Sequence, residues 1–183
     1  MKHFQMIGTF DPVPLMHQVQ THPELWNQNT LRTTHPMSPH GEVDDIWIRF
    51  NDLELWKATG DAAAVLDEHE SIWYPAANVL PGARGLLLWL MARVGGIRLG
   101  RALITKLGPG EKIAPHVDGG SHAAYYERYH LVLQGLPGSQ FRCAEERVEM
   151  LTGQIYWFQN GLEHEVINNS ADDRIHLIAD VRL

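Results

Sequence analysis

The sequence predicts a mainly β fold with flanking helices, in the form of a double-stranded β-helix, or jelly roll. After residue 100 the chain breaks into about eight short apolar runs. Turn-forming residues separate the runs at close intervals, which is typical of sandwiches and barrels rather than of alternating β-α units. Helical patterns are confined to the first hundred residues, so we expect the helices to pack on the outside of the β structure.

The candidate strands follow one another without long gaps. They are RALITKL, KIAPHVD, RYHLVLQG, SQFRCAEE, RVEML, QIYWFQ, HEVINN and RIHLIADV. Gly-Pro-Gly, Gly-Gly, Pro-Gly and Asn-Gly sequences between them are strong turn signals. A chain of 183 residues fits one domain. We expect residues 101–183 to form the jelly-roll core and residues 1–100 to be a strand and helix region that supports it.

The N-terminal hundred residues contain two further candidate strands and a helix. FQMIGTF is a possible short strand, and a helix is expected from Pro14 to about Trp26, entered through the prolines that precede it. In DDIWIRFND the residues Ile46, Ile48 and Phe50 alternate with Trp47 and Arg49. Strict alternation would place the tryptophan and the arginine on one face of the strand.

Two more helices are expected before residue 100. Asp61 is a suitable N-cap for a helix over DAAAVLDEHESIW. Pro81-Gly82 opens a second helix, ARGLLLWLMARV, which Gly95-Gly96 should end. Residues 86–91 leave this helix no polar face, so we expect a sheet to cover it.

Composition excludes several classes of function. The net charge is −7 without a basic region, which disfavours binding to nucleic acid or to anionic membranes. The single cysteine, Cys143, cannot form an intrachain disulfide, which fits a reducing compartment, and we expect it to be a core or strand residue. No apolar run is long enough to span a bilayer, and the N-terminus does not resemble a signal sequence. These features predict a cytoplasmic protein.

Two histidines and one aspartate form a candidate metal site. His116 and Asp118 are separated by one residue in IAPHVDGG, so on an extended strand both would point to the same side. His164 follows the Asn160-Gly161 turn and could approach them from another strand. Two histidines and a carboxylate are the ligands of the facial triad that binds non-haem Fe(II), although Mn, Co, Ni or Zn could occupy such a set. The spacing of the other histidines, His130 aside, indicates no ligand role.

Arg174 opens the run RIHLIADV, ten residues after His164. Its guanidinium could form the two parallel hydrogen bonds that a carboxylate accepts. The alternative is a surface arginine paired with Asp172 or Asp173.

Residues 102–183 resemble the aspartyl/asparaginyl β-hydroxylase family of Fe(II)- and 2-oxoglutarate-dependent dioxygenases. This family also includes bacterial hydroxylases of free amino acids such as proline. The similar stretches are ITKLGPGEKIAPHVDGG, ERYHLVLQG, FRCAEERVEMLTGQIYWFQNGLEHEVINNS and DRIHLIADV. The resemblance implies an enzyme that uses Fe(II), 2-oxoglutarate and O2 and has a jelly-roll fold.

The resemblance also implies roles for individual residues. His116, Asp118 and His164 would bind iron, and Arg174 would bind the distal carboxylate of 2-oxoglutarate with help from the hydroxyl of Thr105. Arg128 and His130 match an arginine and histidine pair that lies near the carboxylate next to the keto group. The alternatives are an ion pair with Glu127 for Arg128 and a core position for His130.

Asp118 indicates which branch of the family the chain resembles. The animal peptidyl aspartyl hydroxylases of the family have a small residue in place of this carboxylate, so the chain is more similar to the bacterial branch, including the cis-proline hydroxylases. The expected reaction is hydroxylation of an unactivated C–H bond in a free amino acid or short peptide, with release of succinate and CO2. Residues 1–100 should supply the specificity, and Arg32, Arg49 and Trp47 are candidates for binding the substrate carboxylate. The competing interpretation of these cations is surface charge.

Two other classes of protein stay open at this point. A cupin-type metalloenzyme, either an isomerase or another dioxygenase, could use the same ligands without 2-oxoglutarate and would not need Arg174 or Thr105. A non-catalytic jelly roll that binds a sugar or a peptide would need no metal.

Overall fold

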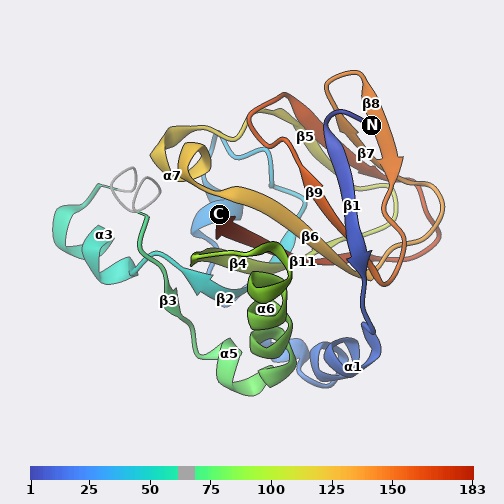
Figure 1. The fold of residues 1–183 in the computed structure, drawn as a ribbon. Helices are drawn as coiled ribbons and strands as arrows, with labels where there is room; N and C mark the ends of the chain where they lie inside the picture. Colours follow the sequence, from blue (N-terminus) through green and yellow to red (C-terminus); the bar gives the residue numbers. More distant parts are fainter. Residues whose placement is uncertain (62–68) are drawn as a thin grey trace.

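The computed structural model describes residues 1–61 and 69–183 of the chain. Two antiparallel sheets face each other, and helices cover the outside of the larger one (Figure 1). The helix predicted to begin at Asp61 falls largely on residues 62–68, which lie outside the described part. The arrangement confirms the predicted jelly roll.

The major sheet has the strand order β1-β9-β6-β11-β4-β2-β3, and the minor sheet has the order β5-β10-β7-β8. All eight strands predicted after residue 100 are present, and so are the two predicted near the N-terminus. The strands are β1 (Phe4–Thr9), β2 (Asp44–Phe50), β3 (Ile72–Trp73), β4 (Arg98–Leu107), β5 (Lys112–His116), β6 (Glu127–Gln134), β7 (Ser139–Cys143), β8 (Glu146–Glu149), β9 (Gln154–Phe158), β10 (His164–Asn168) and β11 (Arg174–Arg182).

The N-terminal strands are part of the larger sheet. Strand β1 pairs with β9 at one edge, and β2 pairs with β4 toward the other. Residues 1–100 therefore extend the β structure as well as covering it. Cys143 on β7 is fully buried, as expected of a core residue.

The helices of the described residues are mostly short. They are α1 (Val13–Thr21), the 3₁₀ turn η1 (Pro23–Leu25), α2 (Leu31–Thr34), α3 (Leu53–Thr59), α5 (Ala76–Val79), α6 (Pro81–Val94) and α7 (Gly120–Tyr125). The helix expected over residues 14–26 ends early because the chain turns at Pro23. None of the helices described is both long and apolar enough to cross a membrane.

Helix α6 confirms the predicted boundaries but is less covered than expected. It begins at Pro81, and Gly95 ends it with a φ of 70°, in the left-handed region that favours glycine. Leu87 and Leu90 are buried, whereas Leu88 is 59% and Trp89 41% exposed. The prediction that a sheet covers the whole apolar run is therefore wrong, because the sheet contacts only one side of the helix.

Two of the three apolar clusters among the described residues hold the layers together. The first lies between the helices and the outer face of the major sheet, and it joins Leu15 and Leu87 to Ile104, Leu131 and Leu177. The second lies between the two sheets. It includes Leu107, Val132, Phe141, Phe158 and Val166. Side chains that alternate along the central strands thus contact either the helices or the space between the sheets.

A β-bulge changes which face Arg49 occupies. On β2, Trp47 pairs with Leu103 and Arg49 pairs with Ala102, so one extra residue is inserted between them. Trp47 consequently stacks on Phe50 at 3.9 Å between ring centroids. The guanidinium of Arg49 lies 4.5 Å over the ring of Trp73, which packs against the outer core. The prediction that Trp47 and Arg49 share a face is wrong, because it assumed unbroken alternation.

Candidate active site

The ends of two neighbouring strands bring the predicted metal ligands together. His116 is the last residue of β5 and His164 is the first residue of β10, and they are direct partners in the pairing of these strands. Asp118 lies just beyond β5 rather than on it, and its backbone N–H donates to the carbonyl of Asn160 at 3.3 Å. One ligand atom from each residue lies within 4.8 Å of the others, so bonds of about 2 Å could join all three to one ion.

Backbone hydrogen bonds determine which ring nitrogen of each imidazole carries a proton. His116 Nδ1 lies 2.8 Å from the carbonyl of Ala114, and His164 Nδ1 lies 2.8 Å from that of Leu162. A carbonyl oxygen can only accept, so each Nδ1 carries a proton, and in the neutral ring the lone pair is then on Nε2. Burial also lowers the pKa of His164 to about 4. Both rings therefore have the orientation that metal-binding histidines usually have, with the Nδ1–H held by a backbone carbonyl.

The lone pairs of the two histidines are directed toward the aspartate. His116 Nε2 lies 3.7 Å from Asp118 Oδ1, and His164 Nε2 lies 3.8 Å from Asp118 Oδ2. The ring centroids of the histidines are 4.2 Å apart. Three donor atoms thus face a common point at the end of the minor sheet.

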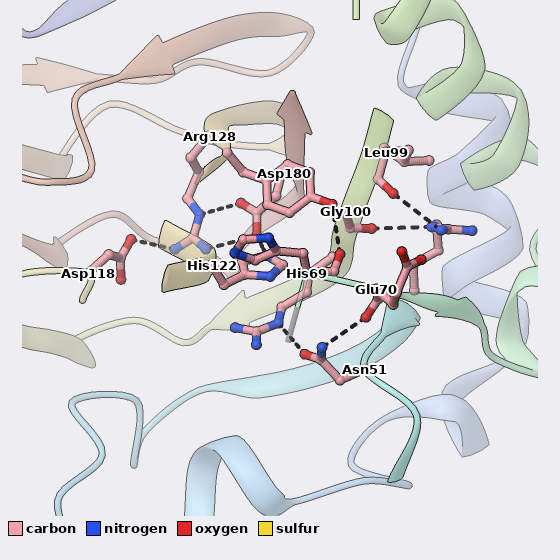
Figure 2. A network of polar contacts seen from close by, with 12 residues as sticks. Asn51, His69, Glu70, Leu99, Gly100, Asp118, His122, Arg128 and Asp180 are labelled. Atoms are coloured by element: carbon pink, nitrogen blue, oxygen red, sulfur yellow. Dashed lines mark hydrogen bonds and ion pairs between the residues drawn. The ribbon is translucent and has the colours of Figure 1, made fainter. Parts of the chain in front are cut away.

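A chain of charged and polar groups holds Asp118 in place (Figure 2). Arg128 on β6 donates to Asp118 Oδ2 at 2.5 Å, and it also donates to both oxygens of Asp180, at 2.8 and 3.1 Å. His122 Nε2 lies 3.0 Å from Asp180 Oδ2. Although burial opposes both charges, the carboxylates raise the pKa of Arg128, and Arg128 and His122 lower the pKa of Asp180. The position of Asp118 therefore depends on Arg128, which Asp180 in turn holds in place.

These contacts refine the predicted role of Arg128. It does not pair with Glu127, which instead accepts from Trp157 Nε1 at 2.6 Å. Its guanidinium borders the cavity beside the ligand group, but it contacts two carboxylates of the chain itself. A role in binding the cosubstrate stays a prediction for this residue.

Arg174 is buried, with 3% of its surface exposed. Burial lowers its pKa to about 9, and no carboxylate of the described residues offsets that effect. The alternative of a surface arginine paired with Asp172 or Asp173 is wrong. Its guanidinium instead contacts His176 Nδ1 at 3.1 Å. A buried cation without an anionic partner is costly, so this position is suited to an anionic ligand.

Thr105 and His130 lie beside this arginine. Thr105 on β4 is directly opposite His176 on β11, two residues along the strand from Arg174. Its hydroxyl is buried without a hydrogen-bond partner among the described residues. His130 is buried on β6 and its Nδ1 lies 3.1 Å from His176 Nδ1. The structure therefore brings Arg174, Thr105 and His130 into one buried polar cluster.

A cavity of about 180 Å³ adjoins the ligand group. The predicted ligands, Arg128 and His130 form part of its wall together with the rings of Phe141 and Phe158. Arg32 and His40, from the segments that precede β2, form another part. The cavity thus connects both halves of the chain around the site.

Arg32 lies where a substrate contact was expected. Its Nε donates to the buried carboxylate of Asp45 at 3.1 Å. Its Nη2 is buried and has no partner among the described residues. An arginine held through one nitrogen, with a second donor unsatisfied at a cavity, is suited to bind an acceptor on a ligand.

The other two candidates for substrate contact, Trp47 and Arg49, are not among the residues that line the cavity. Trp47 is buried and donates to Asp45 Oδ1 at 3.1 Å. Arg49 donates to the carbonyls of Ser71, Leu99 and Gly100 at 2.6, 3.2 and 3.2 Å. Both side chains are occupied in holding strands together, so the structure does not bring them to the substrate.

Sequence reasoning missed four residues around the site. His40 packs edge-on against His116 with ring centroids 5.0 Å apart, and His122, His176 and Asp180 form the hydrogen bonds described above. A signal existed on β11, because residues 174, 176 and 180 are polar and share the inward face in an otherwise apolar strand. His40 lies in a turn-rich segment whose path has no periodic signal.

The fold and the ligand group define a jelly-roll protein with a candidate metal centre at the edge of a cavity. The family model for the aspartyl/asparaginyl β-hydroxylases matches residues 56–183. That match covers more than half of the chain, and the chain therefore belongs to the aspartyl/asparaginyl β-hydroxylase family. The match begins well before residue 102, where the region of sequence resemblance begins.

Solved structures share the fold at low sequence identity. A viral collagen prolyl hydroxylase from Paramecium bursaria Chlorella virus-1 superposes with a TM-score of 0.58 at 9% identity, covering 98% of this chain and 95% of that chain. A Pseudomonas putida prolyl-4-hydroxylase gives 0.56 at 16% identity over 98% and 92%. A 2-oxoglutarate-Fe(II) oxygenase family protein from Burkholderia pseudomallei gives 0.55 at 14% identity over 76% and 66%. No curated protein sequence matches the chain.

The ligand group predicts a specific pattern of metal binding. We expect His116→Ala and His164→Ala each to weaken Fe(II) or Co(II) binding by about 100-fold or more, because two ligands do not hold a divalent ion in a three-ligand site. Equilibrium dialysis of the purified protein measures this. His17→Ala is the matched control, since His17 is exposed on α1. Equal metal binding by all four proteins would contradict the assignment.

The buried ion pair of Asp180 predicts a pH-dependent contribution to stability. We expect Asp180→Asn to lower the free energy of unfolding by about 3 kcal/mol at pH 7, since it leaves Arg128 with half of its buried anionic partners. The pKa of Asp180 is lowered in the folded state, so its contribution is complete above an ordinary aspartate pKa of about 4 and is lost below it. The difference from the original chain should therefore shrink as the pH falls below about 4.

Denaturant titrations at several pH values measure this difference. Glu54→Gln is the control, because Glu54 pairs with Lys57 while both side chains are more than half exposed, and it should change stability by less than about 1 kcal/mol. A difference for Asp180→Asn that grew on acidification would have the wrong sign.

Proposed function

We propose that the protein is an Fe(II)- and 2-oxoglutarate-dependent oxygenase. It hydroxylates an unactivated C–H bond of an amino acid or an amino-acid-like molecule and releases succinate and CO2. Family membership supports hydroxylation as the type of reaction. The observation that carries the specific proposal is that a three-residue ligand group and a buried arginine without an anionic partner lie close together between the two sheets.

One aromatic ring links these two features. The guanidinium carbon of Arg174 lies 5.9 Å from the centre of the Phe141 ring. The same ring centre lies 5.9 Å from that of His164. A short dicarboxylate could therefore interact with the metal centre at one end and with Arg174 at the other, and 2-oxoglutarate is a molecule of that kind.

The residues fit the metal and the cosubstrate. His116, His164 and Asp118 would hold Fe(II), because two neutral imidazoles and a carboxylate are its usual donors in such sites. Arg174 and Thr105 would hold the distal carboxylate, which would satisfy a buried cation and a buried hydroxyl together. When bound, iron and 2-oxoglutarate supply the oxidising chemistry with O2.

The chain itself supplies placement. Arg128 fixes the carboxylate of Asp118 against rotation, and Asp180 fixes Arg128. The carbonyls of Ala114 and Leu162 fix the two imidazoles. Phe141 and Phe158 give the cavity an apolar wall, which limits the access of water to the ligand group. Preorganised groups of this kind do not have to reorient during the reaction.

For the substrate, Arg32 is the residue best placed to act. Its free Nη2 would donate to the carboxylate of an amino acid, while Asp45 keeps the guanidinium in position. The cavity is below the usual range of ligand pockets, roughly 300–1,000 Å³. This supports a small substrate or the end of a short peptide.

Neither of the two competing classes of protein accounts for all features of the site. A cupin-type metalloenzyme without 2-oxoglutarate would use the ligand group but would have no use for a buried, unpaired Arg174. A non-catalytic jelly roll would not need two imidazoles with fixed Nε2 lone pairs beside a carboxylate. A reaction that uses a dicarboxylic cosubstrate accounts for both features.

A turnover assay tests the proposal. We expect the Fe(II)-loaded protein to convert 2-oxoglutarate to succinate and to add one oxygen to a member of a set of free amino acids and short peptides. Succinate is measured by chromatography and oxygen insertion by mass spectrometry. Arg174→Leu should raise the KM for 2-oxoglutarate by about 10- to 100-fold, because it removes a bidentate charge-assisted interaction.

Arg147→Leu is the matched control for this assay, since Arg147 is exposed on β8. Turnover that did not require 2-oxoglutarate would favour the cupin-type alternative. Unchanged kinetics in Arg174→Leu would contradict the assigned cosubstrate site.

The position of Arg32 gives a separate prediction about the substrate. We expect Arg32→Leu to raise the KM for the hydroxylated substrate about 10-fold or more, since a charge-assisted hydrogen bond is lost. Consumption of 2-oxoglutarate in the absence of substrate should be unchanged. Steady-state kinetics measure both, with Arg147→Leu again as control. A KM equal to that of the original chain would rule out this contact.

A further inference from the structure

His176 lies at the centre of the buried polar cluster between the sheets. It is completely buried on β11. Its Nδ1 lies 3.1 Å from Arg174 Nη2 and 3.1 Å from His130 Nδ1. Its spacing from the other histidines did not indicate a ligand role, and the proposed function does not yet use it.

The two contacts of His176 Nδ1 determine where its proton is. A guanidinium nitrogen can only donate, so His176 Nδ1 must accept from Arg174. Two imidazole nitrogens at 3.1 Å need one proton between them, and because His176 Nδ1 accepts, His130 Nδ1 must donate. Neutral His176 then carries its only ring proton on Nε2. Burial and the nearby Arg174 hold the pKa of both histidines well below the usual value, which keeps the rings neutral.

The proton on His176 Nε2 has no acceptor among the described residues, although the atom is buried. The hydroxyl of Thr105 is unsatisfied in the same way. Thr105 and His176 are direct partners on neighbouring antiparallel strands, so their side chains project to the same side of the sheet. A buried donor without an acceptor is destabilising, and here two of them lie beside a guanidinium that has no anionic partner among the described residues.

We propose that His176 donates from Nε2 to the distal carboxylate of 2-oxoglutarate and, with Arg174 and Thr105, selects for a dicarboxylic cosubstrate. The inference rests on the proposed function and deepens it. A carboxylate has about four lone-pair sites, enough to accept from all three residues. His130 is then a positioning residue, because its Nδ1 proton fixes the ring of His176.

This assignment differs from the role expected for His130. In the arrangement found here, the Nδ1–H of His130 donates to His176 Nδ1, and His130 Nε2 is an acceptor in the neutral ring. It therefore cannot donate to the carboxylate next to the keto group. His130 therefore acts on the cosubstrate site only by orienting the ring of His176.

Two substitutions separate a donor role from a structural one. In His176→Gln the side-chain amide can place a donor near the position of Nε2, whereas in His176→Asn the amide lies near the position of Nδ1. We expect the glutamine variant to keep 2-oxoglutarate affinity within a few-fold and the asparagine variant to lose about 10-fold or more. His176→Phe should lose at least as much as the asparagine variant.

The measurement is calorimetric titration of the Mn(II)-loaded protein with 2-oxoglutarate and with 2-oxopentanoate. The second compound has the same carbon chain but a methyl group in place of the distal carboxylate. Its affinity should be nearly the same for the original chain and the asparagine variant, because the contact in question is missing from both complexes. Equal losses for both ligands would indicate a merely structural role and would overturn the inference.

A second measurement needs no variant. Nitrogen-15 NMR of the metal-free protein labelled on histidine should show His176 as the Nε2–H tautomer, with a shift of that resonance when 2-oxoglutarate is added. A proton on Nδ1 would overturn the inference even if a variant failed to fold. If the original Mn(II)-loaded chain bound no 2-oxoglutarate, the proposed function would fail first. If it bound 2-oxoglutarate and all variants bound it equally, only the role of His176 would be wrong.

Discussion

Strand β11 carries three polar side chains into the space between the sheets, and the site depends on satisfying them. Arg174, His176 and Asp180 share its inward face, while Ile175 and Leu177 contact the outer core. Asp180 is neutralised within the chain by Arg128, and that pair holds Asp118 (Figure 2). Arg174 and His176 have no such anion among the described residues. One end of the strand therefore supports the candidate metal site, and the other end is suited to bind an anion.

Much of the β structure could be predicted from the sequence, because short apolar runs separated by Gly, Pro and Asn encode strand and turn locally. The approach of His164 to His116 could be anticipated, because two histidines and an aspartate suit one metal ion and a jelly roll of short strands can bring them together. The bulge that separates Trp47 from Arg49 could not be predicted. It depends on the pairing of β2 with β4, and a single inserted residue reverses the face of every side chain after it.

The residues that sequence analysis missed fall into two physical groups. Asp180 and His176 could have been found, because a polar residue at every second position of a buried strand needs a partner. His40 could not, because it lies in a turn-rich segment without periodicity whose position depends on tertiary contacts. Asp118 lies beside the other two predicted ligands. It was placed wrongly on the strand, since β5 ends at His116 and a hydrogen bond to Asn160 positions the loop.

The two halves of the chain contribute to the site in different ways. The ligand group and the buried polar cluster lie on or directly after strands of the C-terminal half, where ladder hydrogen bonds fix their positions. Arg32 and His40 come from a short helix and a connecting segment of the N-terminal half. Changes in those segments could alter the cavity without disturbing either sheet, whereas a change at Arg174 or Asp180 would leave a buried charge unpaired. The strands thus fix the ligand group and the buried polar cluster more tightly than they fix the residues that would contact a substrate.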